Sequence, residues 1–434
     1  TTPMKSIYLY WIGAIVCCSV MGARGKSSSD TLVMSRAEAE AVFLQRNLQL
    51  LVGRLGIDEA KAKVIQARLW PNPTLSIGEV NLWSNAGAEA LGRLFGTRGN
   101  HAQVAVDVEQ LIQTAGKRKK LIAIEETGVA IAEQDFEDLL RSLKVEFRSQ
   151  LAQLYSMQQR MGVYQQVLSQ LQRLLRGYQR QVEQGNVSRS EYMRLKASEV
   201  ELMKAVDDIR RENGVAQRTL KTLMGITPQE TLVLADDRPP EIPIAAIQLL
   251  DAGTVQEWAQ THSAELAALQ LGTIHAEQEL SYERAQRVPD ITLNANYDRG
   301  GNIMRDFVGV GVSVDLPFFH RNQGNIKAAQ FRLEQSRLRT EHKKNEVAGM
   351  AIQAWKDLLA TIARKEHVGA QYDGDMDKLL AGYHNSFAQR HISLLEYLDF
   401  LEAYLTTKDT LLDTDTELLT QYEVLRYHVG NQLP

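Results

Sequence analysis

YQRQVEQGNVSRSEY, residues 178–192, and YHNSFAQRHISLLEY, residues 383–397, share the pattern Val or Ile, Ser, two variable residues, Glu and Tyr. Like residues recur at one constant offset of 205 positions in seven pairs: Tyr178 and Tyr383, Val187 and Ile392, Ser188 and Ser393, Glu191 and Glu396, Tyr192 and Tyr397, Leu220 and Leu425, and Gly225 and Gly430. Because solenoid repeats are only about 20–50 residues long, this spacing indicates a duplicated half-protein.

Each half has the same predicted order of a helix, two short strands, a very long helix, a tight turn and a shorter helix. The first repeat, residues 24–225, has predicted helices at 35–69, 117–184 and 190–224 and predicted strands at 74–83 and 103–112. The second repeat, residues 254–430, has predicted helices at 254–287, 325–389 and 394–429 and predicted strands at 291–297 and 307–318. Residues 226–253 form a predicted linker between the repeats, and residues 431–434 a C-terminal tail.

The two longest predicted helices exceed what a globular domain requires, since a rise of 1.5 Å per residue makes each about 100 Å long. Apolar residues recur every seven positions in the first of them: Leu140, Phe147, Leu154, Met161, Leu168, Leu175 and Val182. The second half has a similar row: Leu398, Leu405, Leu412 and Leu419. Such rows require a packed partner helix. We therefore expect each half to be a two-stranded helical rod, completed by shorter helices stacked end to end.

The strand segments alternate in polarity, as membrane-barrel strands of about ten residues do. Apolar residues alternate in three runs: Val104, Val106 and Val108; Ile291, Leu293, Ala295 and Tyr297; and Val308, Val310, Val312 and Val314. Aromatic residues lie near the strand ends, where interfacial girdles occur. The competing interpretation is a pair of water-exposed hairpins that cap the rods.

The N-terminal residues 1–23 are predicted to be a signal peptide, because Lys5 precedes an apolar run that ends in small residues. Both cysteines, Cys17 and Cys18, lie within it. Lipidation at one of them is an alternative, although Ala14, Ile15 and Val16 do not supply the small residue expected just before such a cysteine. Since no later uncharged apolar stretch approaches the roughly 20 residues of a membrane helix, any membrane insertion would use the strands.

Several functional classes are excluded or disfavoured by the sequence. The net charge of −4 supplies no basic surface for nucleic acid. Neither a nucleophile elbow, a phosphate loop nor a His-Glu-x-x-His motif is present, so we expect no enzyme, no catalytic residues and no cofactor. No two of the nine histidines are spaced four apart on a predicted helix, so we also expect no metal site.

Four strands are too few to close a barrel, and an open edge in lipid leaves backbone groups unpaired at several kcal/mol each. The predicted barrel must therefore be shared between copies. Two, three or four copies would supply 8, 12 or 16 strands, and composition does not choose between them.

Three features together resemble the TolC outer-membrane factor family: the turn Trp70-Pro71-Asn72-Pro73-Thr74 before the first strand, the segment Val314-Asp315-Leu316-Pro317-Phe318 after the fourth, and the duplicated turn. The resemblance covers residues 35–430. The proline-asparagine-proline turn is most similar to the CzcC and CusC branch, whose members serve heavy-metal efflux pumps. The resemblance implies a mainly α fold with a small membrane β part. It also implies a homotrimer that forms a 12-stranded β-barrel in outer-membrane lipid and a 12-helix periplasmic α-barrel, with the linker at the equator.

The same resemblance implies a passive exit channel of a tripartite pump. Its partners would be a periplasmic adaptor (membrane fusion) protein and an inner-membrane resistance-nodulation-division (RND) transporter, and its cargo heavy-metal cations. Multidrug efflux or type I secretion through the same kind of channel remains an alternative. A periplasmic coiled-coil adaptor without a pore is a further alternative, although adaptors have a single helical hairpin rather than two.

We expect the periplasmic gate at the tip. Adaptor contact is predicted at the two turns: Gly185, Asn186, Val187 and Ser188, and Arg390, His391, Ile392 and Ser393. Glu396 and Asp399 lie three apart, so they share one helical face and would form two carboxylate rings in a trimer. They match the acidic constriction of TolC-like channels. The equivalent face of the first repeat carries Glu191 and Arg194, and we hypothesise that Arg194 pairs with Asp399 or Glu396 to hold the tip closed.

Overall fold

The computed structural model describes residues 31–81, 103–227, 229–235, 240–300, 306–369 and 371–433. The predicted signal peptide at 1–23, both cysteines and the last two residues of the strand predicted at 74–83 lie outside these ranges.

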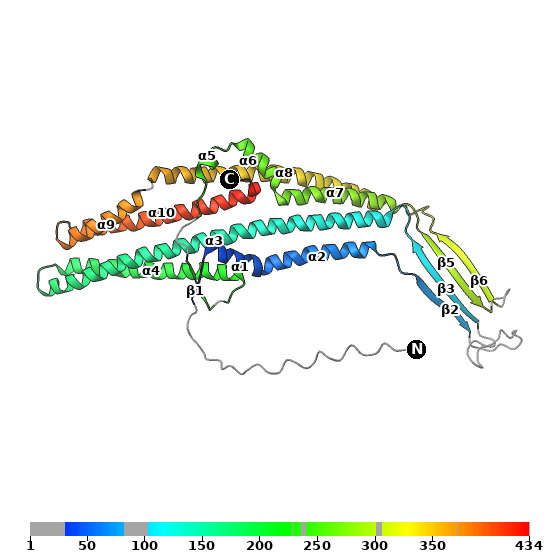
Figure 1. Cartoon of the computed structure of the whole chain (residues 1–434), viewed down its shortest axis with the longest axis horizontal. Helices are drawn as coiled ribbons and strands as arrows, with labels where there is room; N and C mark the ends of the chain where they lie inside the picture. The colour runs from blue at the N-terminus through cyan, green and yellow to red at the C-terminus, as the bar shows by residue number, and fades with distance from the viewer. Residues whose placement is uncertain are drawn as a thin grey trace, which may run out of the picture.

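Long, roughly parallel helices make up most of the chain. A small sheet lies at one end, and the two turns that connect helices at residues 185–188 and 390–393 lie at the other (Figure 1). The first repeat contains β1 (Thr31–Met34), α1 (Arg36–Arg46), α2 (Leu48–Arg68), β2 (Thr74–Asn81), β3 (Gln103–Ile112), α3 (Lys117–Glu183) and α4 (Arg189–Met224). Next come β4 (Thr231–Leu234), α5 (Ile244–Gln248), α6 (Ala252–His262), α7 (Ala264–Ala285), β5 (Ile291–Arg299), β6 (Asp306–Val314), α8 (Gln323–Val368), α9 (Tyr372–Ala388), α10 (Leu394–Val429) and a 3₁₀ turn, Gly430–Gln432. The predicted fold class, mainly α with a small β part and a duplicated order, is confirmed.

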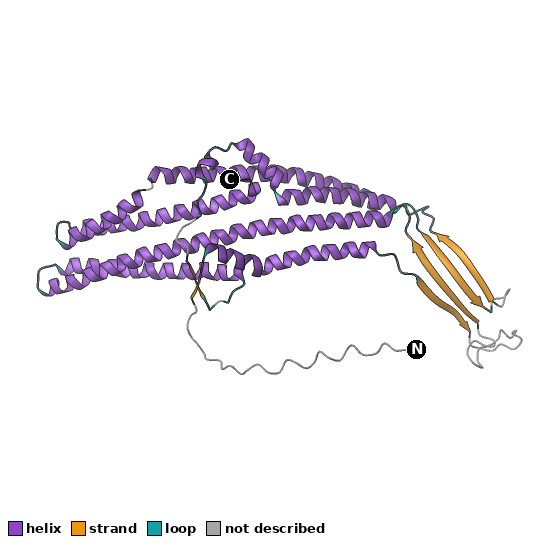
Figure 2. Ribbon diagram, viewed as in Figure 1, coloured by secondary structure: helices purple, strands orange, loops and turns teal. Residues whose placement is uncertain are grey.

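The four strands of the larger sheet lie in the order β2-β3-β5-β6, and every neighbouring pair is antiparallel. The helices continue this order, because α2 packs on α3, α3 on α7, and α7 on α8. Each of these helices leads directly into a strand or out of one. The sheet and the helical layer therefore have matching edges, with β2 and α2 on one side and β6 and α8 on the other (Figures 1 and 2).

Three helices predicted to be continuous are interrupted. The helix predicted at 35–69 breaks at Asn47, whose side chain caps α2 by accepting from the Leu50 amide and whose Nδ2 donates to Leu223 O at 2.8 Å. The helix predicted at 254–287 breaks at Ser263, which caps α7 through the Leu266 amide. The helix predicted at 325–389 breaks after Val368, where Gly369 adopts a φ of 77° that a right-handed helix cannot accommodate.

Two strand boundaries and the linker also differ from the sequence prediction. The strand predicted at 307–318 runs from Asp306 to Val314, and Pro317 beyond it lacks a backbone N–H to extend the ladder. The strand predicted at 291–297 continues to Arg299. The predicted linker 226–253 contains α5 and β4, and β4 pairs in parallel with β1 to form a small sheet partway along the rod (Figure 2).

The core is divided into clusters spaced along the rod. Near the middle, Phe43 of α1 stacks on Phe147 of α3 with ring centroids 4.5 Å apart. In α10, the apolar row predicted at Leu398 and Leu405 is only partly buried, and the buried apolar residues include Tyr397, Leu401, Tyr404 and Leu418 instead. The buried row is displaced by about one residue, and α10 has more than one partner: its first half packs on α3 and α9, and its second half on α8.

Within the part of the chain that the structure describes, no helix combines the length and the apolar character needed to cross a bilayer.

Candidate functional site

The two turns at the end of the rods have the same local structure, a left-handed residue followed by a serine helix cap. After α3, Gly185 takes a φ of 74°, and Ser188 then caps α4 by accepting from the Glu191 amide at 3.2 Å. After α9, Arg390 takes a φ of 63°, and Ser393 caps α10 by accepting from the Glu396 amide at 3.2 Å. The sequence therefore fixes both tip turns locally, through a left-handed residue followed three positions later by a serine cap.

Aromatic side chains join the two turns to each other. Tyr178 of α3 stacks on Phe387 of α9 at 5.4 Å, and Phe387 stacks on Tyr397 of α10 at 4.7 Å. Burial raises the pKa of Tyr397 to about 12, so this phenol remains neutral. Arg390 adds a polar contact, because its Nη2 lies 3.5 Å from Oε1 of Gln181 on α3. The tip thus behaves as one packed unit within a protomer.

The four charged residues predicted at the gate are all exposed at this tip: Glu191, Arg194, Glu396 and Asp399. Glu396 completes a capping box, because one of its carboxylate oxygens accepts from both Ser393 N and Ser393 Oγ at 2.8 Å. These hydrogen bonds lower the pKa of Glu396. Among the described residues of one protomer, neither Arg194 nor Asp399 has an ion-pair partner within 4.0 Å.

Farther from the tip, beyond the apolar cluster that α3 and α10 share, ion pairs connect these two helices. Arg160 of α3 contacts Asp409 at 3.2 Å and Asp413 at 2.6 Å. Tyr164 donates to Asp409 at 2.7 Å, and burial together with this hydrogen bond raises its pKa. Nearer the sheet, Arg148 contacts Glu423 of α10 at 2.8 Å.

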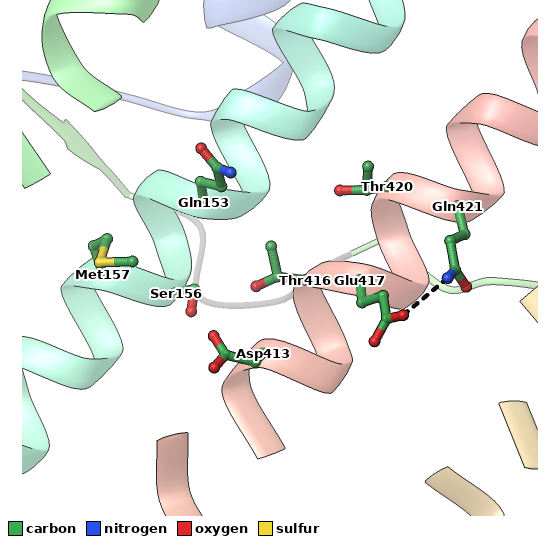
Figure 3. A pocket seen from close by; sticks show the side chains of 8 residues that line it. All are labelled: Gln153, Ser156, Met157, Asp413, Thr416, Glu417, Thr420 and Gln421. Carbon is green, nitrogen blue, oxygen red and sulfur yellow. Dashed lines mark hydrogen bonds between the residues drawn. The ribbon is translucent and has the colours of Figure 1, made fainter. Parts of the chain in front are cut away.

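A hollow of about 300 Å³ lies in this seam between α3 and α10 (Figure 3). Its lining is polar except for one methionine: Gln153, Ser156, Met157, Asp413, Thr416, Glu417, Thr420 and Gln421. Ser156 is only 3% exposed, and its hydroxyl has no hydrogen-bond partner among the described residues. A polar hollow of this size can hold water, which would satisfy that hydroxyl.

A second polar seam joins α9 to α10. Lys408 is 7% exposed and contacts Asp373 at 2.6 Å and Asp377 at 2.8 Å. Tyr404 donates to Asp377 at 2.8 Å. These contacts attach the short helix after the Gly369 break to its neighbour.

The sheet has one apolar and one polar face, set by cross-strand register. Apolar residues share one face: Leu75 and Ile77 on β2, Val106 and Val108 on β3, Leu293, Ala295 and Tyr297 on β5, and Val308, Val310 and Val312 on β6. The opposite face carries Ser76, Asp107, Asn296 and Gly309 in one cross-strand row and Thr74, Glu109, Asn294 and Gly311 in the next. Gly309 and Gly311 leave room for the Asn296 and Asn294 side chains, since a Cβ on either glycine would overlap them.

The sequence prediction did not identify Asp107 and Glu109 as functional residues. The signal was present, because they alternate with Val106 and Val108 and must therefore face away from the apolar side. Among the described residues neither carboxylate has an ion-pair partner. The described ranges also contain no group of three or more His, Cys, Asp or Glu residues able to bind a metal ion.

Comparison with known proteins agrees with this architecture. The profile of the family described as outer membrane efflux protein matches residues 42–226 and 256–431. No curated protein matches the chain. Among solved structures, CusC is 17% identical with a TM-score of 0.70, covering 92% of this chain and 93% of that chain.

Two further solved structures are similarly related. VceC from Vibrio cholerae is 14% identical with a TM-score of 0.71, covering 92% of this chain and 97% of its own. The CmeC outer membrane channel from Campylobacter jejuni is 12% identical with a TM-score of 0.71, covering 91% and 85%. At these identities the likeness establishes the fold, while the profile match extends over most of the chain. The chain therefore belongs to the outer membrane efflux protein family, and is an outer-membrane protein with a long periplasmic helical part.

Proposed function

We propose that three copies of this chain form a 12-stranded barrel that continues into a 12-helix periplasmic tunnel, and that the trimer is the exit channel of a tripartite RND-type efflux pump. The observation that carries the proposal is the pair of free sheet edges, since among the described residues β2 and β6 each pair with a single neighbouring strand. Unpaired strand edges are not tolerated in hydrocarbon, so β2 of one copy would pair with β6 of the next.

Exposed apolar residues on the matching helical edges support the same assembly. On α2, Leu48, Val52 and Leu55 are all more than 65% exposed. Their spacing of four and then three residues puts them on one helical face. The opposite edge presents Phe331 and Leu338 of α8, seven residues apart. Contact between these two edges in neighbouring copies would bury both rows.

For the cargo we propose heavy-metal cations. Carboxylates support this choice at both ends of the proposed conduit: Glu396 and Asp399 are exposed at the tip, and on the polar sheet face Glu109 is exposed and Asp107 is partly exposed. Three copies would repeat each carboxylate around the axis, which attracts cations and repels anions. The proline-asparagine-proline turn, similar to that of the CzcC and CusC branch, also supports heavy-metal cations as the cargo.

Deletion of the gene, followed by growth assays against metal cations and against neutral antibiotics, tests this cargo. The proposal predicts increased sensitivity to one or more metal cations and unchanged sensitivity to the antibiotics. The reverse pattern would identify a multidrug channel and leave the proposed architecture intact.

At the tip, we propose an ion pair between Arg194 of one copy and Asp399 of its neighbour as part of the closed gate. Asp399 is favoured over Glu396 because the Glu396 carboxylate already accepts two hydrogen bonds from Ser393. An exposed pair stabilises by only about 0.2–1 kcal/mol, so three equivalent pairs would act together. The adaptor would engage the exposed turns beside them, at 185–188 and 390–393.

Conductance in planar bilayers tests the gate. Arg194→Ala should increase the leak conductance, whereas Lys204→Ala on the same helix should not, because Lys204 pairs locally with Asp208. The charge exchange Arg194→Asp with Asp399→Arg should return the leak toward the wild-type value. Unchanged conductance in Arg194→Ala would show that this ion pair does not hold the gate closed.

A further inference from the structure

A hollow of about 590 Å³ lies where the second repeat passes from sheet to helix. It is lined by residues from the turn after α7, the segment after β6 and the first turns of α8: Arg287, Phe319, Arg321, Gln323, Ile326, Lys327 and Gln330. Figure 1 places this junction beside the helical end of the strands. Three of the lining side chains are cationic and none is anionic.

The positive charge of this hollow is not compensated within the described residues. Arg287, Arg321 and Lys327 are all exposed, and none of them has a carboxylate within 4.0 Å. Arg321 makes its polar contact with a neutral group, because its Nε donates to Pro317 O at 3.2 Å. Nearby Glu283 is held by Asn322, whose Nδ2 donates to it at 2.5 Å. Three cations around one hollow repel each other, so an anion bound there would be stabilised.

The beginning of α8 adds hydrogen-bond donors to the same place. Asn322 precedes the helix with a φ of 55°, makes no side-chain cap, and no acidic residue lies in the first turn. The first amides of this helix therefore lack a side-chain acceptor. A Cβ built on Gly324 would meet no atom within 4 Å, so the space beside these amides is open. Amides and cations together form a surface suited to phosphate.

Apolar side chains next to the hollow indicate which phosphate compound it would bind. Phe319 is 96% exposed, and Leu316 and Phe318 are each 66% exposed. They follow directly after β6, whose apolar face carries Val310 and Val312. Aromatic residues at strand ends mark the boundary between lipid and water. A ligand here would therefore combine a phosphate with acyl chains.

We propose that this hollow binds the headgroup of an anionic phospholipid from the periplasmic leaflet of the outer membrane. Arg287, Arg321 and Lys327 would contact the phosphate, while Phe318 and Phe319 would lie against the glycerol and the upper acyl chains. The α8 edge is also the edge offered to a neighbouring copy, so the lipid would lie close to a subunit boundary and strengthen it.

Native mass spectrometry of the full-length protein in neutral detergent tests the proposal. The protein is titrated with phosphatidylglycerol, and separately with phosphatidylcholine that carries the same acyl chains. The wild type should bind phosphatidylglycerol about tenfold more tightly. In Arg287→Gln/Arg321→Gln/Lys327→Gln this preference should fall to within about twofold, because each charged contact to phosphate is lost.

The matched control is Arg339→Gln/Lys344→Gln/Lys356→Gln, which removes the same number of positive charges at exposed positions of α8 away from the hollow. It should retain the preference. If the triple variant at the hollow does not fold, Arg287→Lys/Arg321→Lys keeps the charge but loses the bidentate geometry, and should show an intermediate preference. Equal binding of the two lipids by the wild type would overturn the proposal, as would loss of the preference in the control.

A competition arm separates lipid from free phosphate. Inorganic phosphate at about 10 mM should leave most of the bound phosphatidylglycerol in place, since it cannot supply the acyl contacts. Complete displacement would identify a site for free phosphate and overturn the lipid proposal.

Discussion

Arg390 in the second tip turn occupies the position that Gly185 occupies in the first, 205 residues earlier, and both adopt a left-handed backbone, with φ of 63° and 74°. Only glycine takes this conformation without a steric penalty from Cβ. The second repeat therefore has arginine at a position where the first repeat has glycine, the residue that a left-handed backbone favours. The Arg390 side chain extends to Gln181 at the end of α3, beside the other turn, and glycine could not make this contact.

Arg390→Gly should raise the free energy of unfolding by up to about 1 kcal/mol, because the left-handed strain is relieved. The same variant should impair pump function, because the contact to Gln181 is lost. Gly185→Ala should destabilise the protein by a similar amount. Chemical denaturation and an efflux assay measure the two effects. A less stable Arg390→Gly variant would show that the side-chain contact outweighs the backbone strain.

Lys117 and Asp290 join the two repeats at the base of the sheet through an ion pair of 2.8 Å, in which Lys117 is only 3% exposed. Asp290→Asn should lower the free energy of unfolding by about 3 kcal/mol, because it leaves a buried ammonium without a counter-charge. The amide oxygen can still accept from Thr114 N, which now donates to Asp290 at 2.8 Å. Adding Lys117→Met should recover most of the loss, and strictly additive losses would show that the two residues do not interact.

The two faces of the sheet should respond oppositely to a new charge. Val310→Lys puts an ammonium on the apolar face, where Val310 is 87% exposed, and should cost about 2–4 kcal/mol in a bilayer. Asn294→Lys, one position along the neighbouring strand but on the polar face, should cost less than about 1 kcal/mol. Urea unfolding of protein reconstituted in vesicles provides the comparison. Equal costs would contradict a lipid-facing apolar side.

His384 should make the tip sensitive to acid. Its Nδ1 lies 3.3 Å from Tyr397 Oη, and burial, with a smaller contribution from Arg173, lowers its pKa below the ordinary value of 6.5. The unfolded chain then binds the proton first, so stability falls as the pH drops below about 6.5 and stops falling below the folded-state pKa.

His384→Gln cannot take up this proton, so the difference in thermal midpoint between the wild type and this variant isolates the effect. The wild type should lose stability relative to the variant between about pH 7.5 and pH 5. Burial also lowers the pKa of His428. Because His428 is present in both proteins, its contribution cancels in the difference between them. A difference that does not change with pH would exclude His384 as the titrating group.

Much of the fold could be predicted because its signals are local. Ser188 and Ser393 are helix caps next to left-handed residues, and the alternation around Val106 and Val310 identifies strands without knowledge of their neighbours. The breaks at Asn47 and Ser263 were missed because one helix ends and another begins without disturbing the apolar periodicity. The single glycine at 369 carried too little signal to predict a break.

Features that depend on distant partners could not be predicted. The pairing of β1 with β4 joins four-residue strands about 200 positions apart, and neither has a distinctive pattern by itself. The capping role of the Glu396 side chain follows from the sequence Ser-Leu-Leu-Glu. Whether Arg194 has an ion-pair partner depends on how α4 packs, and within the described ranges of the chain it has none. The gate assignment itself stays a prediction.

The trimeric channel is tested most directly by electron cryo-microscopy of the full-length protein in detergent. The account predicts a particle with threefold symmetry, in which β2 of each protomer pairs with β6 of the next and twelve strands lead into a tunnel of twelve helices. A monomeric particle, or an oligomer in which β2 and β6 remain unpaired, would contradict it.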